Sequence, residues 1–287
     1  MFDIIIPIYR IEPLILKLCL ESITNQEYTK YEIWIVDGTP EDWEHQTKIL
    51  DIIKQTPLIN YLRQSGKGLA QARNQAIAAG SNSYVALLDG DDFWYPHHLS
   101  EIANAIAKST RDTVVWWDAA VYPIKMHSAR NRGVGTAFVQ QYLYEDMELY
   151  DDLTEILSDY IILPSTSVIR RTRIEDIGGF NESLHYREDV DFFWRLSKTA
   201  YKGKFVNQFG CIALLSDDMR KEDGWEDKMK DYWNTFIVNN ADYEFSESMQ
   251  RFNLVGGEAH PSQEVMDLCF QLYDFDERNP LNRLQQD

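Results

Sequence analysis

The sequence predicts an α/β fold with a mostly parallel sheet and helices on both faces. Two observations support this fold class. Short apolar runs rich in β-branched and aromatic residues recur along the first 120 residues, and helical patterns lie between them. Several runs are almost continuously apolar, as parallel strands covered on both faces are. The expected strands span residues 2–6, 31–36, 58–62, 84–88 and 113–117.

The segments between these strands carry helix signals. Pro13 suits a first helical turn, and apolar side chains then recur on one face up to Ile23. Residues 43–53 show a similar pattern, and the alanine-rich segment 70–79 ends at Gly80. Strands that alternate with helices indicate βαβ units, and therefore a mostly parallel sheet.

The pattern weakens after residue 117. Residues 119–145 contain proline and glycines and are expected to form a long loop. The acidic stretch 145–159 is interpreted as a solvated helix face. A strand over 165–169 and an amphipathic helix over 188–199 are expected to follow. Residues 240–287 carry ten acids and three bases, and we expect them to form a mainly helical acidic appendage with no chemistry of its own.

Charge and composition exclude several function classes. The chain has 287 residues, with 28 Lys+Arg against 46 Asp+Glu and a formal net charge of −18. This charge repels polyphosphate backbones, so no nucleic-acid partner is expected. No apolar run approaches the roughly 20 residues of a membrane span. The odd number of widely spaced cysteines favours a reducing compartment. We therefore expect a cytoplasmic protein, or one peripheral to a membrane that carries its acceptor.

Carboxylates follow two of the expected strands. Asp37 comes directly after the second strand, and Asp89, Asp91 and Asp92 follow the fourth. Ligands of open α/β sheets bind at the carboxyl ends of the strands, where these side chains would meet. Four acids at one edge need a cation, and Mg²⁺ or Mn²⁺ shared with a diphosphate is the natural candidate. The alternative is that residues 89–92 form only a polar turn.

Other phosphate-binding and catalytic motifs fit poorly. Residues 66–71 lack the third glycine of a dinucleotide fingerprint, and they follow the third expected strand instead of the first. The sequence contains no Walker loop, no Gly-x-Ser-x-Gly elbow and no His-Glu-x-x-His pair.

Six segments, in order, resemble glycosyltransferase family 2, the inverting nucleotide-sugar transferases of the GT-A fold. They extend over residues 2–196, about two thirds of the chain. These segments are residues 2–9 (FDIIIPIY), 20–38 (with LESITNQ and YEIWIVDG), 66–74 (GKGLAQARN), 87–92 (LLDGDD), 177–181 (IGGFN) and 187–196 (REDVDFFWRL). The resemblance implies a Rossmann-like GT-A domain over residues 1–239. Its nucleotide-binding half would span 1–118 and its acceptor-binding half 119–239.

The resemblance also implies a role for individual residues. Asp189 would be the general base that takes the proton of the acceptor hydroxyl. Mn²⁺ or Mg²⁺ would be held by Asp91 and Asp92, the latter being the more direct ligand. The donor-binding residues would be Pro7, Tyr9 and Asp37 around the nucleobase, Arg73 nearby, and Asp89 and Asp91 towards the ribose and metal. The implied function is the inverting transfer of a sugar from a nucleoside diphosphate to a hydroxyl of a glycan or glycolipid.

Two departures from the family pattern leave alternatives open. Gly38 stands where many members carry a second acid, and residues 211–220 lack a histidine that many members offer to the phosphate or metal. Asp217, Asp218 and Arg220 are candidates to replace that histidine. A GT-A domain without turnover, acting as a nucleotide-sugar-binding or scaffolding protein, is therefore an alternative. A glycosidase that uses Asp189 is a third hypothesis, against which the acidic metal turn argues.

Overall fold

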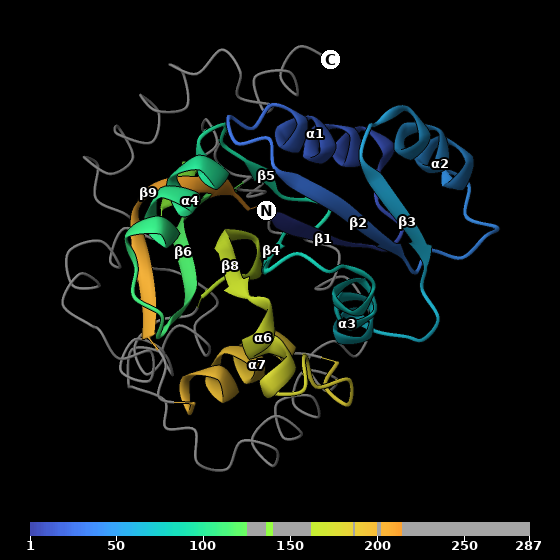
Figure 1. The fold of residues 1–287 in the computed structure, drawn as a ribbon. Coiled ribbons are helices and arrows are strands. Elements are labelled where there is room, and N and C mark those ends of the chain that lie inside the picture. The colour runs from blue at the N-terminus through green and yellow to red at the C-terminus, as the bar shows by residue number, and fades with distance from the viewer. Residues whose placement is uncertain (125–135, 140–161, 186, 200–201, 214–287) are drawn as a thin grey trace.

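The computed structural model describes residues 1–124, 136–139, 162–185, 187–199 and 202–213. Within these residues the chain forms one nine-stranded sheet (Figure 1). The strands are β1 Phe2–Ile8, β2 Tyr31–Asp37, β3 Ile59–Arg63, β4 Tyr84–Leu87, β5 Phe93–Trp94, β6 Thr113–Ile124, β7 Thr136–Val139, β8 Ser167–Arg170 and β9 Lys202–Ile212. Their spatial order is β3-β2-β1-β4-β8-β6-β9-β5, and β7 pairs with β6.

The first four strands in this order are all parallel, as the sequence predicts. β1 lies between β2 and β4, with Ile4 opposite Ile33 on one side and Ala86 on the other. β8 then runs antiparallel between β4 and β6, whereas β9 runs parallel to β6. The result is an α/β sheet in which β1 to β4 end at the same edge, the edge where ligands of such sheets bind.

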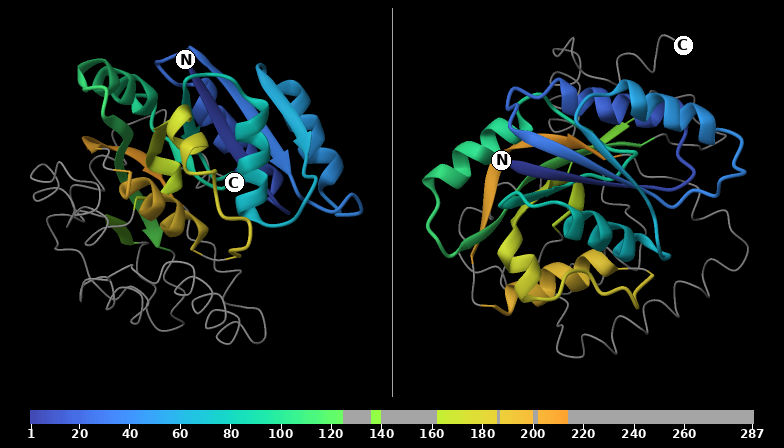
Figure 2. Two further views of the ribbon diagram at one scale, coloured as in Figure 1. Left: turned by 60° about the horizontal axis from the view of Figure 1, so that its bottom comes forward. Right: turned by 45° about the vertical axis from the view of Figure 1, so that its right-hand side comes forward.

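Helices cover both faces of the sheet (Figures 1 and 2). The helices are α1 Pro13–Thr24, α2 Gln46–Gln55, α3 Leu69–Ala79, α4 His98–Lys108, α6 Arg171–Asp176 and α7 Glu188–Ser197. Side chains of α1, α2 and α4 join one buried cluster with Ile4 and Ile6, whereas α3, α6 and α7 join a second cluster with Ile5. Successive residues of a strand point to opposite faces, so the continuous apolar run of β1 serves both clusters.

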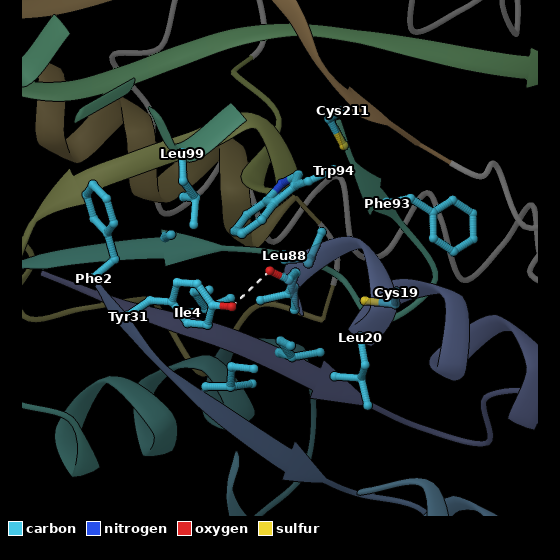
Figure 3. Close-up of a cluster of buried hydrophobic side chains, with 14 of the residues drawn as sticks. Phe2, Ile4, Cys19, Leu20, Tyr31, Leu88, Phe93, Trp94, Leu99 and Cys211 are labelled. Carbon is cyan, nitrogen blue, oxygen red and sulfur yellow. Dashed lines mark hydrogen bonds between the residues drawn. The ribbon is translucent and has the colours of Figure 1, made fainter. Parts of the chain in front are cut away.

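The first cluster includes the large rings of Phe2, Phe93 and Trp94 (Figure 3). Cys19 and Cys211 lie in the same cluster as free thiols. Burial, reinforced by the nearby aspartates, raises the pKa of both thiols well above the ordinary value. These cysteines are therefore neutral packing groups and not nucleophiles.

The prediction of a loop over residues 119–145 was wrong for the two parts of this range that the structure describes. Residues 119–124 continue strand β6, and residues 136–139 form β7 beside it. Pro123 indicated a break, but pairing with β7 and β9 keeps residues 119–124 extended. The expected strand over 165–169 begins as a 3₁₀ turn, Pro164–Thr166, before β8. The expected acidic face over 145–159 and the appendage over 240–287 lie outside the described residues. In the described part of the chain, no helix is both long and apolar enough to cross a bilayer.

A buried ion pair links β1 to α6 at the amino end of the sheet. Asp3 of β1 is fully buried and pairs with Arg171, the first residue of α6. Asp3 also accepts hydrogen bonds from Trp34 Nε1 at 3.1 Å and from Asn82 Nδ2 at 2.7 Å. Arg171 in turn donates to the carbonyl oxygens of Asn82 and Ile77. This network joins β1, β2, the end of α3 and α6, opposite the edge that carries the site.

Replacing Arg171 by Met should therefore destabilise the protein. Asp3 would keep a buried charge without its cationic partner, and breaking such a pair typically costs about 3–5 kcal/mol. Urea unfolding measures the free energy directly. Arg173→Met is the matched control on the same helix, because the Arg173 side chain is more exposed and forms an i,i+3 pair with the exposed Asp176; such pairs are worth about 0–1 kcal/mol. If both substitutions lower the free energy of unfolding by the same amount, the Asp3–Arg171 pair does not stabilise the sheet.

Candidate active site

The carboxyl ends of β1 to β4 meet at one edge of the sheet. Ile8 at the end of β1 lies opposite Asp37 at the end of β2, and Asp37 lies opposite Arg63 at the end of β3. β4 ends at Leu87, two residues before Asp89. The structure thus brings the two acidic segments to the same edge, as the sequence predicts.

Pro7 and Tyr9 lie at the end of β1. Pro7 is buried in the strand, whereas Tyr9 is 62% exposed and follows it. The guanidinium of Arg10 lies over the Tyr9 ring, 5.4 Å from its centroid, and the Arg10 backbone N–H donates to Thr39 Oγ1 at 2.8 Å. Tyr9 is thus a largely exposed aromatic side chain at this edge, of a kind that can stack on a planar ring.

Asp37 is fully buried, and its partners are groups of the protein. It accepts hydrogen bonds from the Thr39 backbone N–H at 2.8 Å, Gln46 Nε2 at 2.7 Å and the Tyr61 hydroxyl at 3.0 Å. Arg63 Nη1 adds an ion pair at 3.1 Å. The negative charge of Asp37 is thus compensated inside the protein, and Asp37 holds the ends of β2 and β3 together.

Gly38 leaves room for the side chain of Gln64. A Cβ at position 38 would lie 2.2 Å from Gln64 Oε1 and 3.6 Å from Tyr9 Cδ2. Gln64 Nε2 is fixed by hydrogen bonds to Gly68 O and to Gln71 Oε1, both 2.9 Å long. An acidic side chain at position 38 would displace this glutamine. The departure from the family pattern at Gly38 therefore has a structural counterpart in Gln64.

The Asp89–Asp92 turn is fixed by backbone contacts. The Asp89 N–H donates to Ser165 Oγ, and the Asp92 N–H donates to Asp89 O, each at 3.0 Å. Burial, together with the charge of Asp89, raises the pKa of Asp91 to about 6. The turn therefore concentrates negative charge that a bound cation would relieve.

Arg73 connects this turn to α7. The side chain is only 2% exposed and projects from α3. Its Nη2 binds Asp89 Oδ1 at 2.7 Å, and its Nη1 binds Glu188 Oε1 at 2.8 Å. Burial alone would lower the pKa of Arg73, but the two carboxylates outweigh burial and raise it, so the guanidinium stays charged. The Phe180 ring covers it at 5.3 Å.

Asn74, the next residue of α3, holds the segment that leads to α7. Asn74 Nδ2 donates to Phe180 O at 2.9 Å, and Asn74 Oδ1 accepts from the Phe180 N–H at 2.8 Å. Gly179, with φ +74°, brings its backbone close to this amide, where a Cβ would lie 2.6 Å from Asn74 Oδ1. The contact holds segment 177–181 against segment 66–74.

α7 begins with Glu188 and Asp189 after Arg187, which has a left-handed φ of 62°. Asp189 is half-buried and accepts from the Val190 backbone N–H at 2.9 Å. In the described part of the chain no side chain donates to it. Asp191, by contrast, is buried and bound to Arg195 Nε at 2.8 Å. Asp189 is therefore the acid of α7 that remains available to a ligand.

The carboxylate oxygens of the acidic turn could bind a divalent cation only together with a bound ligand that completes the coordination shell of the metal. Within the described residues, no group of three or more His, Cys, Asp or Glu side chains converges as a metal cage. Asp91 and Asp92 supply hard oxygen donors, and Mg²⁺ commonly binds one or two carboxylates together with substrate phosphates. The candidates Asp217, Asp218 and Arg220 lie outside the described residues.

Sequence reasoning missed three residues at this edge. Arg63, Gln64 and Glu188 are in contact with other residues of the site but were not selected as site residues. Arg63 and Gln64 directly follow an expected strand that neighbours Asp37, which is a signal that could have identified them. Glu188 could be recognised as a site residue only from its contact with Arg73, 115 residues away in sequence.

Comparisons with known proteins agree with this geometry. The family model described as glycosyl transferase family 2 matches residues 3–178. The uncharacterized glycosyltransferase YwdF of Bacillus subtilis is 30% identical over 216 residues, which cover 75% of this chain and 74% of YwdF. The pre-mycofactocin glycosyltransferase of Mycobacterium tuberculosis is 27% identical over 163 residues, covering 54% of this chain and 31% of that protein.

Solved structures share the fold at low sequence identity. TarS of S. aureus, solved in complex with UDP-GlcNAc, superposes with a TM-score of 0.62 and 16% identity, covering 88% of this chain and 73% of TarS. The mannosyltransferase PcManGT of Pyrobaculum calidifontis, in complex with GDP-Man and Mn²⁺, gives a TM-score of 0.61 and 15% identity, with coverage of 99% and 84%. With the family match over most of the sheet, these likenesses lead to one conclusion: the chain belongs to glycosyl transferase family 2 and is a glycosyltransferase of the GT-A fold.

Proposed function

We propose that this protein transfers a sugar from a nucleoside diphosphate to a hydroxyl group of a glycan or glycolipid, with inversion at the anomeric carbon. One observation carries the proposal. Arg73 joins the acidic turn after β4, through Asp89, to the start of α7, through Glu188. A sugar donor bound at this turn would therefore lie near the start of α7, where the carboxylate of Asp189 could act on an acceptor.

The donor would lie along the carboxyl edge of β1 to β4. Pro7, Tyr9 and the segment after Asp37 would form the nucleobase end, and Asp89 with Arg73 would form the side towards the ribose and phosphates. Asp91 and Asp92 would hold Mn²⁺ or Mg²⁺. A metal bound there would neutralise the charge of the leaving diphosphate. TarS was solved with UDP-GlcNAc and PcManGT with GDP-Man and Mn²⁺, which supports a nucleotide-sugar donor and a divalent metal in general.

Asp189 would act as the general base. Asp189 is partly exposed at the first turn of α7, and in the described part of the chain no side chain donates to its carboxylate. It would take the proton of the acceptor hydroxyl as that oxygen attacks the anomeric carbon, which typically accelerates such a step by about 10²–10⁴. A single displacement without a covalent intermediate inverts the anomeric centre, as in inverting glycosidases.

Glu188 is less suited to this role. It is buried and bound to Arg73. Burial, reinforced by the charge of Asp189, raises the pKa of Glu188 to about 7, although Arg73 opposes the shift. We propose that Glu188 fixes the start of α7 and leaves Asp189 free to accept a proton.

A thermal-shift screen tests donor binding. UDP-, GDP-, dTDP- and CMP-sugars would be added with and without Mn²⁺. A ligand at a hundredfold excess over its dissociation constant raises the free energy of unfolding by about 2.7 kcal/mol. We expect a Mn²⁺-dependent shift with at least one nucleotide sugar. Asp92→Asn should abolish the Mn²⁺-dependent part, whereas Asp51→Asn on the exposed face of α2 should keep it. A shift without any donor hydrolysis would favour a binding or scaffolding protein, and hydrolysis that survives a chelator would contradict the metal site.

Asp189→Asn should leave donor affinity nearly unchanged and lower turnover by about 10²-fold or more, because the amide cannot accept the proton. Single-turnover transfer, or Mn²⁺-dependent donor hydrolysis where no acceptor is known, measures this rate. Asp176→Asn, at a position 52% exposed on α6, is the matched control. If both variants turn over at the wild-type rate, Asp189 is not the base.

Glu188→Gln should change how stability depends on pH. The native pKa near 7 lies above the ordinary value of 4.5, so the folded state binds more protons than the unfolded state between these pH values. Under this condition the free energy of unfolding falls as pH rises. The variant lacks this loss, so its stability relative to wild type should increase from pH 5 to pH 8. Denaturant unfolding at several pH values measures the difference, with Glu175→Gln as control; parallel pH profiles would contradict the shifted pKa.

A further inference from the structure

We infer that Ser165 is a positioning residue, whose hydroxyl fixes the acidic turn Asp89–Asp92 and so sets where the proposed metal ligands stand. The inference rests on the proposed donor-binding function. Ser165 lies in the 3₁₀ turn Pro164–Thr166 that precedes β8, and it is 2% exposed. It therefore reaches the acidic turn from the antiparallel part of the sheet, whereas the other contacts of the candidate site come from β1 to β3, α3 and α7.

The register of the sheet places Ser165 beside the acidic turn. β4 and β8 are antiparallel, and their last pair is Ala86 with Val168. In such a ladder each further residue of one strand faces the preceding residue of the other, so Asp89 would face Ser165. Ser165 is part of a 3₁₀ turn, however, and its backbone leaves the ladder. Its hydroxyl oxygen accepts the Asp89 N–H at 3.0 Å and thus takes the place of a ladder carbonyl.

The position of the acidic turn depends on the backbone of Asp89. The Asp89 carbonyl oxygen accepts the Asp92 N–H at 3.0 Å, which closes the turn. Gly90 packs against the end of β1, where a Cβ would lie 2.7 Å from Ile8 Cγ2. The turn is therefore held by packing on the side of β1 and by the serine hydroxyl on the side of β8. A shift of the Asp89 backbone would move the carboxylates of the turn with it.

Trp94 in turn holds Ser165. The Trp94 Nε1–H donates to the carbonyl oxygen of Ser165 at 2.6 Å, and the indole lies in the buried cluster of Figure 3. The His98 ring stacks on the indole with 4.5 Å between the ring centroids, and His98 Nδ1 lies 2.5 Å from Asp118 Oδ2. Side chains of β5, α4 and β6 thus fix the carbonyl group of Ser165, while its hydroxyl fixes the turn.

Loss of the Ser165 hydroxyl should displace the turn. A methyl group in its place, as in alanine, cannot accept a hydrogen bond, so the Asp89 N–H would lose its partner at a buried contact. A donor left without a partner costs more than the hydrogen bond itself contributes. The turn should therefore move until this N–H finds another acceptor, and Asp91 and Asp92 should leave the positions proposed for binding a metal.

Isothermal titration of UDP, GDP, dTDP and CMP with and without Mn²⁺ tests this consequence. In Ser165→Ala, the gain in nucleotide affinity on adding Mn²⁺ should fall about 3- to 10-fold, while the affinity without Mn²⁺ stays nearly unchanged. Ser167→Ala is the matched control and should keep the gain, because Ser167 is also buried but its hydroxyl donates to Pro164 O at 2.8 Å. An intact gain in Ser165→Ala, or an equal fall in both variants, would overturn the inference.

Two further variants separate the hydrogen bond from packing. Ser165→Cys nearly keeps the side-chain volume but offers only a weak acceptor, so it should lower the gain as alanine does; it also covers the case in which Ser165→Ala does not fold. Trp94→Phe keeps an aromatic ring but cannot donate to Ser165. It should lower the gain in the wild-type background and add nothing in the Ser165→Ala background. Additive losses would overturn the role of Ser165 as the link between Trp94 and the turn.

Hydrogen exchange of the backbone amides measures the contact itself and needs no ligand. In Ser165→Ala, the Asp89 amide should exchange at least about threefold faster than in the wild-type protein. The Leu88 amide, which donates to Ile5 O, should keep its rate. Unchanged exchange at Asp89 in the folded variant would overturn the inference, whether or not a nucleotide binds. If the wild-type protein binds none of the four nucleotides, the proposed function is rejected instead.

Discussion

The charged bridge through Arg73 is the interaction on which the candidate site depends. A single buried guanidinium on α3 holds Asp89 from the turn after β4 and Glu188 from the start of α7. The guanidinium offsets the charge of both carboxylates, of which Glu188 is buried and Asp89 is partly exposed. The bridge therefore sets the separation between the acidic turn proposed to hold the donor and Asp189, which is proposed to act on the acceptor. Asn74 supports the bridge by holding the Gly179–Phe180 segment.

Three acids at the same sheet edge differ in how their charge is compensated. Asp37 is compensated by protein donors and Arg63, and Asp89 by Arg73. Asp91 has no cationic partner among the described residues, and burial together with the charge of Asp89 raises its pKa. Asp91 is proposed, together with Asp92, to meet a metal. At the amino edge, by contrast, the buried Asp3 is paired with Arg171. This contrast favours ligand binding at the carboxyl end of the strands.

Much of the fold could be predicted because local pattern and tertiary role agree. Continuous apolar runs such as β1 have to be buried on both faces, and the run of Ile4, Ile5 and Ile6 contributes to both core clusters. The second half was harder. β6 contains a proline and β9 is only weakly apolar, and these strands are extended because they pair with each other, which no local signal records. Likewise, motif order located Asp37, Arg73, Asp89 and Asp189, but it did not indicate that Asp37 is enclosed or that Gln64 occupies the space beside Gly38.

The most direct test of the bridge is the Mn²⁺-dependent hydrolysis of a nucleotide-sugar donor by Arg73→Lys. Lysine keeps the positive charge but cannot reach Asp89 and Glu188 with separate arms of one planar group. We expect a folded protein whose turnover falls by at least about tenfold, while Arg111→Lys remains at the wild-type rate. Wild-type turnover by a folded Arg73→Lys variant would contradict the claim that this bridge assembles the site.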